Sequence, residues 1–159
     1  MTDRSHDAVA TGAGAIEEIR GEMGYVLEDQ IGFRLRKAHQ RATDDFNAVM
    51  GRFDVTPTQF AALAKLHDAG PLPQSQLGRL TAMDPATILG VVRRLAKRGY
   101  VQQSLDPADA RLVVVCLTPE GHAAAARMRA AAGEVSKRTL APLTATQAAM
   151  LLRLVGKLG

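Results

Sequence analysis

Two short helical segments separated by a tight turn constrain the fold of this chain more than any other feature. The first covers residues 73–80, and we expect Leu77 and Leu80 to face inward. The second begins after Asp84-Pro85, which places a proline directly behind an N-cap residue, and it ends at Gly99. Two helices about three residues apart have the spacing of a helix-turn-helix motif.

A β-hairpin is predicted directly after this pair of helices. Residues 100–104 can form a strand, residues 106–110 have the composition of a turn, and residues 112–117 are a β-branched run. A helix-turn-helix followed by such a hairpin is a winged helix-turn-helix, in which the hairpin forms the wing. We therefore expect a mainly α fold with a small β-hairpin wing.

Further helices are predicted on both sides of this module. Residues 56–59 form a capping box ahead of a helix that ends near Ala69, and residues 144–147 form a second one ahead of a final apolar helix. Thr118-Pro119 opens an alanine-rich helix between them. From Tyr25 onward, residues recur at steps of three and four, as in a long amphipathic helix. They are Ile31, Leu35, Ala38, His39, Ala42, Phe46, Val49, Met50 and Phe53.

Size and charge narrow the choice of partner. With 159 residues, 47% of them apolar, the chain can build one domain with a real core, but not comfortably two. The net charge is +4, and most of the excess lies in residues 73–117. The basic residues there are Arg79, Arg93, Arg94, Lys97, Arg98 and Arg111, against Asp84, Asp106 and Asp109. This excess of positive charge favours a polyanionic binding partner. The low aromatic content (4%) favours duplex DNA over single-stranded nucleic acid as that partner.

Enzyme chemistry has little support in the sequence. We find no Ser/His/Asp order, paired carboxylates, phosphate loop or metal-ligand spacing, so we expect no catalytic site, no cofactor and no metal site. Cys116 is the single cysteine and cannot form a disulfide within one chain, which fits a reducing compartment. Neither a membrane span nor a signal peptide is recognisable. We expect a cytoplasmic protein without membrane association.

Five stretches of the chain together resemble one family of bacterial regulators. They are residues 63–66 before 70–72, residues 76–80, residues 87–95, residues 97–101, and residues 106–111 running into 117–121. Over residues 27–158 the chain is similar to the MarR family. The resemblance implies a homodimer with intertwined terminal helices, in which each subunit presents one winged helix to a pseudo-palindromic operator in double-stranded DNA.

The resemblance also divides the chain by role. It implies an N-terminal arm (1–24), a dimerisation helix (25–56), a winged helix-turn-helix DNA-binding domain (57–118) and C-terminal dimerisation helices (119–159). The expected function is regulation of transcription, as a repressor. One departure from the family lies at Pro73, where Ser or Thr is common, so the helix that follows should lack a side-chain cap.

The second helix of the motif is expected to read DNA bases. Its inward residues are Ile88, Val92 and Leu95, which leaves Ala86, Thr87, Leu89, Gly90 and Arg93 toward the groove. Thr87 can donate or accept a hydrogen bond, Ala86 can touch a thymine methyl, and Arg93 is the best candidate for guanine. The alternative is that Arg93 and Lys97 only form a solvated helix face.

Other residues of the module are expected to contact the DNA backbone. Ser75 and Gln76 begin the first helix of the motif and can meet phosphates, or they can simply cap that helix. By resemblance, Arg111 reaches the minor groove or pairs with Asp109 to hold the wing. Arg94 is assigned to support of the wing or contact with phosphate.

The resemblance further implies release from DNA by a small molecule. Family members commonly bind small aromatic acids or phenols where the dimerisation helices meet the winged helix. Arg34 could pair with the carboxylate of such an effector, and His39 and His67 with a ring hydroxyl or nitrogen. The alternative for His39 is a hydrogen-bonded core histidine. Residues 32–41, 56–63 and 80–88 are similar to the subgroup that represses nicotinate degradation, which makes 6-hydroxynicotinate the first candidate.

A second function class stays open from the sequence. Winged helices also serve as protein–protein adaptors that bind no DNA. An adaptor would not need the basic excess between Arg79 and Arg111, so we rank it behind the DNA-binding regulator. Oxidation sensing ranks lower still, since Cys116 sits in an apolar strand as a small hydrophobe.

Overall fold

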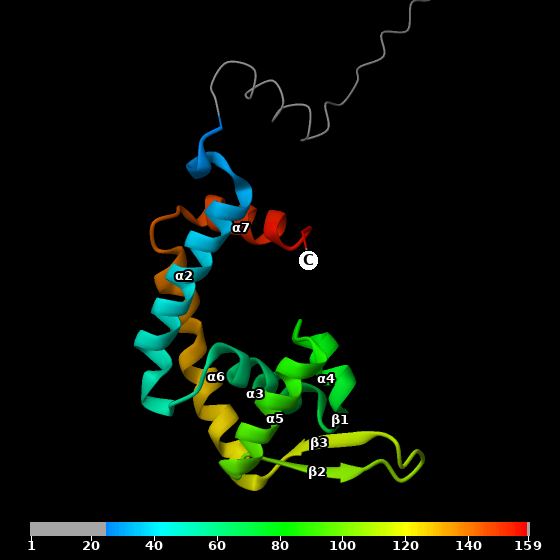
Figure 1. Ribbon diagram of the computed structural model, residues 1–159. Helices are drawn as coiled ribbons and strands as arrows, with labels where there is room; N and C mark the ends of the chain where they lie inside the picture. Colours follow the sequence, from blue (N-terminus) through cyan, green and yellow to red (C-terminus); the bar gives the residue numbers. More distant parts are fainter. Residues whose placement is uncertain (1–24, 159) are drawn as a thin grey trace, which may run out of the picture. The chain divides into compact units, whose positions relative to one another are not determined.

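The computed structural model describes residues 25–158, which form two compact units, residues 25–39 and residues 40–158 (Figure 1). The N-terminal arm expected over residues 1–24 lies outside the described residues. Helix α2 (Ile31–Met50) contributes to both units, and every later element belongs to the second. No helix among the described residues is long and apolar enough to span a membrane.

Helix α2 is shorter than the sequence pattern suggests. It begins at Ile31 instead of near Tyr25, because a 3-10 helix (η1, Leu27–Asp29) and an extended Gln30 come first. A second 3-10 helix (η2, Gly51–Phe53) follows, and Asp54 closes it in the left-handed conformation with φ of 52°.

Only part of the apolar stripe of α2 is buried. Phe46 and Met50, near its C-terminal end, are 7% and 0% exposed and join the core of the second unit. Ile31 and Leu35, in the first unit, are 63% and 40% exposed. The stripe therefore continues onto a surface that this chain leaves open to solvent.

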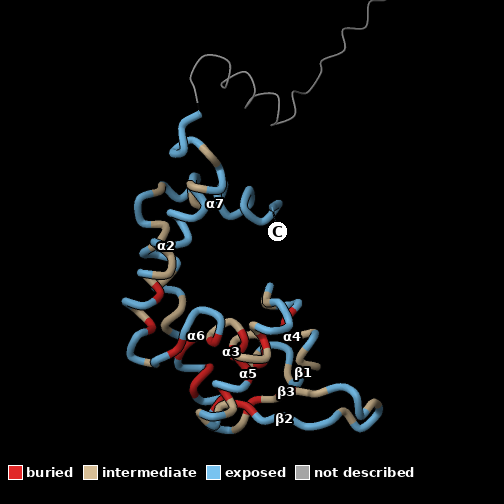
Figure 2. The backbone as a smooth tube through the Cα atoms, in the orientation of Figure 1, coloured by how far each residue is buried: buried red, intermediate tan, exposed pale blue. Residues whose placement is uncertain are grey.

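The winged helix-turn-helix consists of α3 (Pro57–Ala69), α4 (Gln74–Leu80), α5 (Pro85–Lys97), β2 (Val101–Leu105) and β3 (Val113–Leu117). The capping box before α3 is confirmed, since the hydroxyl of Thr56 accepts from the backbone N–H of Gln59, whose side chain accepts in return from the N–H of Thr56. Figure 2 shows that buried residues concentrate in this module. Its fully buried side chains include Leu63, Leu66, Leu77, Ile88, Val91, Val92, Leu95 and Val115.

The wing sheet has a third strand that the sequence did not reveal. Strand β1 (Leu72–Pro73) pairs antiparallel with β3, with Leu72 opposite Val115, and gives the strand order β1-β3-β2. Two residues are too few to produce an alternating pattern, and a proline is tolerated only because β1 is an edge strand. This strand ties the base of the wing to the start of α4, and α4 has no side-chain cap at Pro73, as expected.

The prediction that Leu80 faces inward is wrong. Leu77 is completely buried, but Leu80 is 47% exposed. Gly78 takes the second buried position of α4 instead, because the backbone of α4 there approaches α5 closely. A Cβ atom on Gly78 would lie 3.2 Å from the side chain of Ile88. Leu80 is the last residue of the helix.

Two helices complete the second unit. Helix α6 (Pro119–Leu140) begins at Thr118, whose hydroxyl accepts from the N–H of Gly121, and its start lies against the base of the wing. Helix α7 (Ala145–Val155) follows the predicted second capping box, which is confirmed. No residue of α7 is buried (Figure 2). Its large apolar side chains are 42–62% exposed, namely Met150, Leu151, Leu152, Leu154 and Val155.

Candidate nucleic-acid interface

Helix α5 has one fully apolar face and one open face. Ile88, Val92 and Leu95 are buried as expected, and Val91, which was not predicted to face inward, is also completely buried. On the opposite face Ala86 and Arg93 are exposed, while Gly90 is half-buried. The small side chain at Ala86 suits close approach to base edges, whereas the guanidinium of Arg94 lies over Gly90.

The start of α5 is fixed by two hydrogen bonds between Asp84 and Thr87. One carboxylate oxygen of Asp84 accepts from the backbone N–H of Thr87 at 2.8 Å, and the other accepts from its hydroxyl at 2.7 Å. These bonds hold the pKa of Asp84 below its usual range. The hydroxyl proton of Thr87 is therefore engaged within the protein, so Thr87 offers DNA an acceptor and not the donor that the sequence also allowed.

Ser75 and Gln76 lie in the first turn of α4. Ser75 is exposed and Gln76 is half-buried, and no side chain caps this helix. Neither Ser75 nor Gln76 therefore caps α4 with its side chain. Instead Gln74, one residue earlier, accepts a hydrogen bond from the side-chain amide of Gln103 in β2 at 3.2 Å and connects α4 to the wing.

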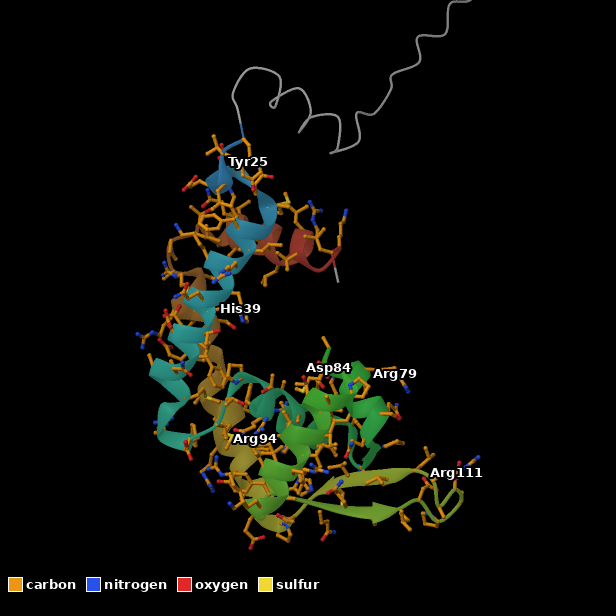
Figure 3. The ribbon with its side chains drawn as sticks, viewed as in Figure 1. Tyr25, His39, Arg79, Asp84, Arg94 and Arg111 are labelled. Atoms are coloured by element: carbon orange, nitrogen blue, oxygen red, sulfur yellow. The ribbon has the colours of Figure 1, made fainter. Side chains whose placement is uncertain are left out.

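The wing turn is held by two aspartates. Asp106 accepts from the N–H groups of Ala108 and Asp109, at 2.7 and 3.2 Å. Asp109 accepts from the backbone N–H of Arg111 at 3.0 Å and pairs with its guanidinium. Figure 3 shows Arg111 at the far end of the wing from α5, and its side chain is 90% exposed. The pair with Asp109 foreseen in the sequence is present.

Arg94 lies beside a cleft of the second unit. It was assigned to the wing or to phosphate, but it lies on the side of α5 that borders α3, where it lines a cleft together with Thr56 and Gln59 (Figure 3). Its guanidinium folds back along the helix, 3.4 Å from where a Cβ of Gly90 would be. Both roles expected of Arg94, support of the wing and contact with phosphate, remain predictions.

The three candidate effector residues have different surroundings. In the first unit, Arg34 pairs with Asp29 at 2.7 Å, and His39 is exposed (Figure 3), so His39 is not a core histidine of this chain. In the second unit, His67 of α3 lies 2.8 Å from the guanidinium of Arg129 on α6. An arginine has only donors, so in this contact Nδ1 of His67 is the acceptor.

Sequence reasoning missed the partners of His67. Arg129 also contacts the carboxylate of Asp68, and the ring of His122 lies 5.8 Å from that of His67. His122 and Arg129 are two helical turns apart on α6, so they share a face, and this spacing was the available signal. Among residues 25–158, no group of three or more His, Cys, Asp or Glu side chains is arranged to hold a metal ion.

Comparisons with known proteins agree on one family. The model of the MarR family matches residues 55–113. The chain is 40% identical over 134 residues to the HTH-type transcriptional repressor NicR of Pseudomonas putida, and the match covers 84% of this chain and 85% of NicR.

Solved structures give the same result for the fold. A probable transcriptional regulator from Pseudomonas aeruginosa is 50% identical, with a TM-score of 0.80, over 84% of this chain and all of that one. Bordetella bronchiseptica BpsR, whose DNA binding is regulated by 6-hydroxynicotinic acid, is 33% identical, with a TM-score of 0.81, over 86% of this chain and 97% of BpsR. The mainly α, winged-helix architecture is therefore shared with regulators of transcription.

Proposed function

This protein belongs to the MarR family of transcriptional regulators, and from that premise we propose that it binds a pseudo-palindromic DNA operator as a homodimer and leaves it when a small aromatic acid binds. It is a transcriptional repressor of the MarR type and not an enzyme. Because a repressor acts on the chromosome, we place it in the cytoplasm. Its specific operator, effector and contact residues belong to the proposal.

The observation that carries DNA binding is the open face of α5. This face presents small side chains at Ala86 and Gly90 and positive charge at Arg93 and Lys97, opposite a completely buried apolar face. The one acid at this helix, Asp84, is engaged in capping it. A helix of this kind fits the major groove, where Arg93 can form two hydrogen bonds to guanine. The exposed Arg111 on the wing then extends the contact to the backbone or minor groove.

The exposed apolar surface of α7 supports a homodimer. A monomeric soluble protein rarely leaves a contiguous apolar patch open, and Leu152 and Leu154 are 62% and 50% exposed. Two recognition helices related by a two-fold axis would reach successive major-groove faces about 34 Å apart. We therefore expect inverted half-sites about ten base pairs apart.

A small aromatic carboxylate is the proposed effector class, with 6-hydroxynicotinate as the first candidate. The similarity to BpsR, whose DNA binding is regulated by 6-hydroxynicotinic acid, supports this choice. In the second unit, His67 and Arg129 supply an imidazole ring and a positive charge side by side. A carboxylate can replace Asp68 as the partner of Arg129, since both offer the same acceptor oxygens. Arg34 and His39 remain further candidates.

The experiment is a gel-shift titration of the intergenic DNA next to the gene of this protein, with and without 6-hydroxynicotinate. We expect specific binding that is released by 6-hydroxynicotinate and not by nicotinate, which lacks the hydroxyl group. Specific binding without release would remove the effector from the proposal but keep the operator. Absence of specific binding, together with a partner interaction that is insensitive to salt, would favour the protein–protein adaptor.

A further inference from the structure

Arg98 is the residue at which α5 ends, and its side chain reaches the loop between α2 and α3. Its guanidinium donates hydrogen bonds to the backbone carbonyl oxygens of Phe53, at 3.0 Å, and of Asp54. These two residues close η2 shortly before the capping box of α3. The end of α5 is therefore joined by hydrogen bonds to a segment that lies 44 and 45 positions earlier in the chain.

The ring of Tyr100 also contacts the guanidinium of Arg98. The guanidinium carbon lies 4.9 Å from the centre of the ring, and one terminal nitrogen is 3.5 Å from the hydroxyl. A planar guanidinium stacks on an aromatic face in a defined orientation. The backbone carbonyl of Tyr100 in turn accepts from the N–H of Thr118, which caps α6. Arg98 thus contacts both the loop before α3 and the base of the wing.

These contacts engage the side chain of Arg98 within the protein. Both terminal nitrogens donate to carbonyl oxygens, the Asp54 carboxylate lies 3.7 Å away, and only 29% of the side chain is exposed. Lys97, one residue earlier, is exposed and forms no ion pair among residues 25–158. Arg98 could therefore reach DNA only by giving up the contacts that join α5 to the preceding loop.

Directional contacts of this kind fix how α5 is oriented. Its buried face is apolar, and apolar contacts attract without a preferred direction. Hydrogen bonds from a charged guanidinium are stronger than neutral ones and require a defined geometry. Near the start of α5, the close approach of Gly78 to Ile88 limits its position, and at its end the contacts of Arg98 do so. The two ends of α5 are thus held by different elements.

The loop that Arg98 contacts continues the helix expected to form the dimer. Met50, the last residue of α2, is completely buried in the core, and Phe53 packs against the same core. In the proposed homodimer, the two α5 helices must reach major-groove faces about 34 Å apart. Their separation depends on the angle between α5 and the end of α2 in each subunit. The contacts of Arg98 lie where that angle is set.

We propose that Arg98 is a positioning residue of the DNA-binding module, which orients α5 against the end of α2 and thereby selects the spacing of the two half-sites. Arg98 itself makes no contact with DNA. Its positive charge stabilises the fold, unlike the charges proposed for DNA at Arg93 and Lys97. The inference rests on the proposed DNA binding by a homodimer.

The test compares Arg98→Gln and Arg98→Lys with the wild-type protein by fluorescence anisotropy. The probes are the operator duplex, two duplexes whose half-site spacing is one base pair longer or shorter, and a duplex with a single half-site. We expect both variants to bind the operator roughly tenfold more weakly, which is the scale of one hydrogen bond to a charged group. The preference for the native spacing should fall toward one, while affinity for the single half-site should change little.

The lysine variant separates geometry from charge. Lysine keeps the positive charge but lacks the planar fork that serves two carbonyls and stacks on Tyr100. A positioning role therefore predicts that Arg98→Lys behaves like Arg98→Gln. If Arg98→Lys keeps the full operator affinity and Arg98→Gln does not, the charge of Arg98 is what matters, and the positioning role is wrong.

A matched control removes the same charge one residue earlier. Lys97→Gln should make the dependence of log K on log salt shallower by about one unit on every duplex, without changing the preferred spacing. Arg98→Gln should keep the salt dependence of the wild-type protein. Arg127→Gln, at an exposed position of α6, controls for the loss of an arginine elsewhere and should match the wild-type protein in each property. Thermal melting of each variant checks its fold.

A measurement on the wild-type protein tests the inference even if the Arg98 variants fold poorly. The guanidinium N–H signals of Arg98 should be protected from exchange with water in the free protein, and their NMR shifts should stay the same when operator DNA is added. The Arg93 signals should shift, since Arg93 is expected at the bases. A shift of the Arg98 signals as large as that of Arg93 would show a DNA contact and overturn the inference.

The outcomes separate the inference from the proposed function. If the wild-type protein binds its operator and both Arg98 variants keep its spacing preference, the positioning role is wrong and the repressor stands. If the wild-type protein binds no duplex at all, both proposals fail.

Discussion

Both carboxylate oxygens of Asp109 accept hydrogen bonds from the guanidinium of Arg111, at 2.9 and 3.0 Å. The two residues belong to the wing turn and are two positions apart. The arginine that the family resemblance assigns to DNA is thus already held in the free protein, in a position away from α5. A contact of Arg111 with DNA has to replace or accommodate this pair.

This pair should survive mild acid. The hydrogen bonds from Arg111 hold the pKa of Asp109 below its usual range, and Asp109 in turn raises the pKa of Arg111. A carboxyl group whose pKa is lowered in the folded protein stabilises it above the pKa of the unfolded chain, and this contribution is lost as pH falls through the lower value. The NMR shift of the Arg111 Nε should therefore stay constant from pH 8 to pH 5. A midpoint within that window would contradict the pairing.

Replacing Arg93 should reduce both affinity and sequence preference. Arg93 lies on the open face of α5, so Arg93→Ala is expected to cost about 1–3 kcal/mol on the operator and to relax selection at one base pair. The measurement is fluorescence anisotropy with the operator and with single-base variants of it. If Arg93→Ala weakens all duplexes by the same factor, Arg93 contacts phosphate instead of guanine.

An alanine at Gly121 should destabilise the protein. A Cβ there would lie 1.9 Å from the backbone carbonyl oxygen of Tyr100, so the start of α6 must move away from the wing. We expect Gly121→Ala to lower the free energy of unfolding by about 1–3 kcal/mol, measured by urea denaturation.

The matched control is Gly133→Ala in the same helix. A Cβ there meets no atom within 4 Å, so this change should stabilise α6 by up to about 1 kcal/mol. Equal effects of the two substitutions would show that α6 does not pack closely on the wing.

A charge on α7 should prevent dimerisation. Leu152 is 62% exposed in the single chain, so Leu152→Glu leaves the fold of the chain intact but places a carboxylate in an apolar interface. We expect a monomer by size-exclusion chromatography with light scattering, and weaker binding to a full operator. Thr146→Glu, at an exposed polar position at the start of α7, is the control and should remain dimeric. A dimeric Leu152→Glu protein would exclude this face of α7 from the interface.

The effector response should depend on His39. His39→Ala is expected to weaken the release of operator DNA by 6-hydroxynicotinate while leaving DNA binding without the effector unchanged. Gel-shift titrations at several effector concentrations measure both properties. An unchanged response would exclude His39 from the site and direct attention to His67 and its partner Arg129.

Short-range patterns explain why much of the fold was predictable. Capping residues such as Thr56 and Asp84 act on N–H groups three residues away, so the starts of α3 and α5 are visible in the sequence. Strand β1 was not visible, because its two residues are stabilised by pairing with β3, more than 40 positions later. Leu80 was misassigned for a related reason, since the buried position of α4 belongs to Gly78, whose backbone approaches Ile88 of another helix.

Local periodicity, capping and residue type were enough to predict the order of helices and wing and the basic character of the DNA-facing module, and the matching stretches pointed to the family. The direction of each functional side chain became visible only in the folded chain. Folding turned Arg94 toward α3, engaged the hydroxyl of Thr87 with Asp84, and joined His67 to Arg129 across two helices. The physical reason is that such contacts join positions whose proximity depends on packing, and no local pattern encodes that packing.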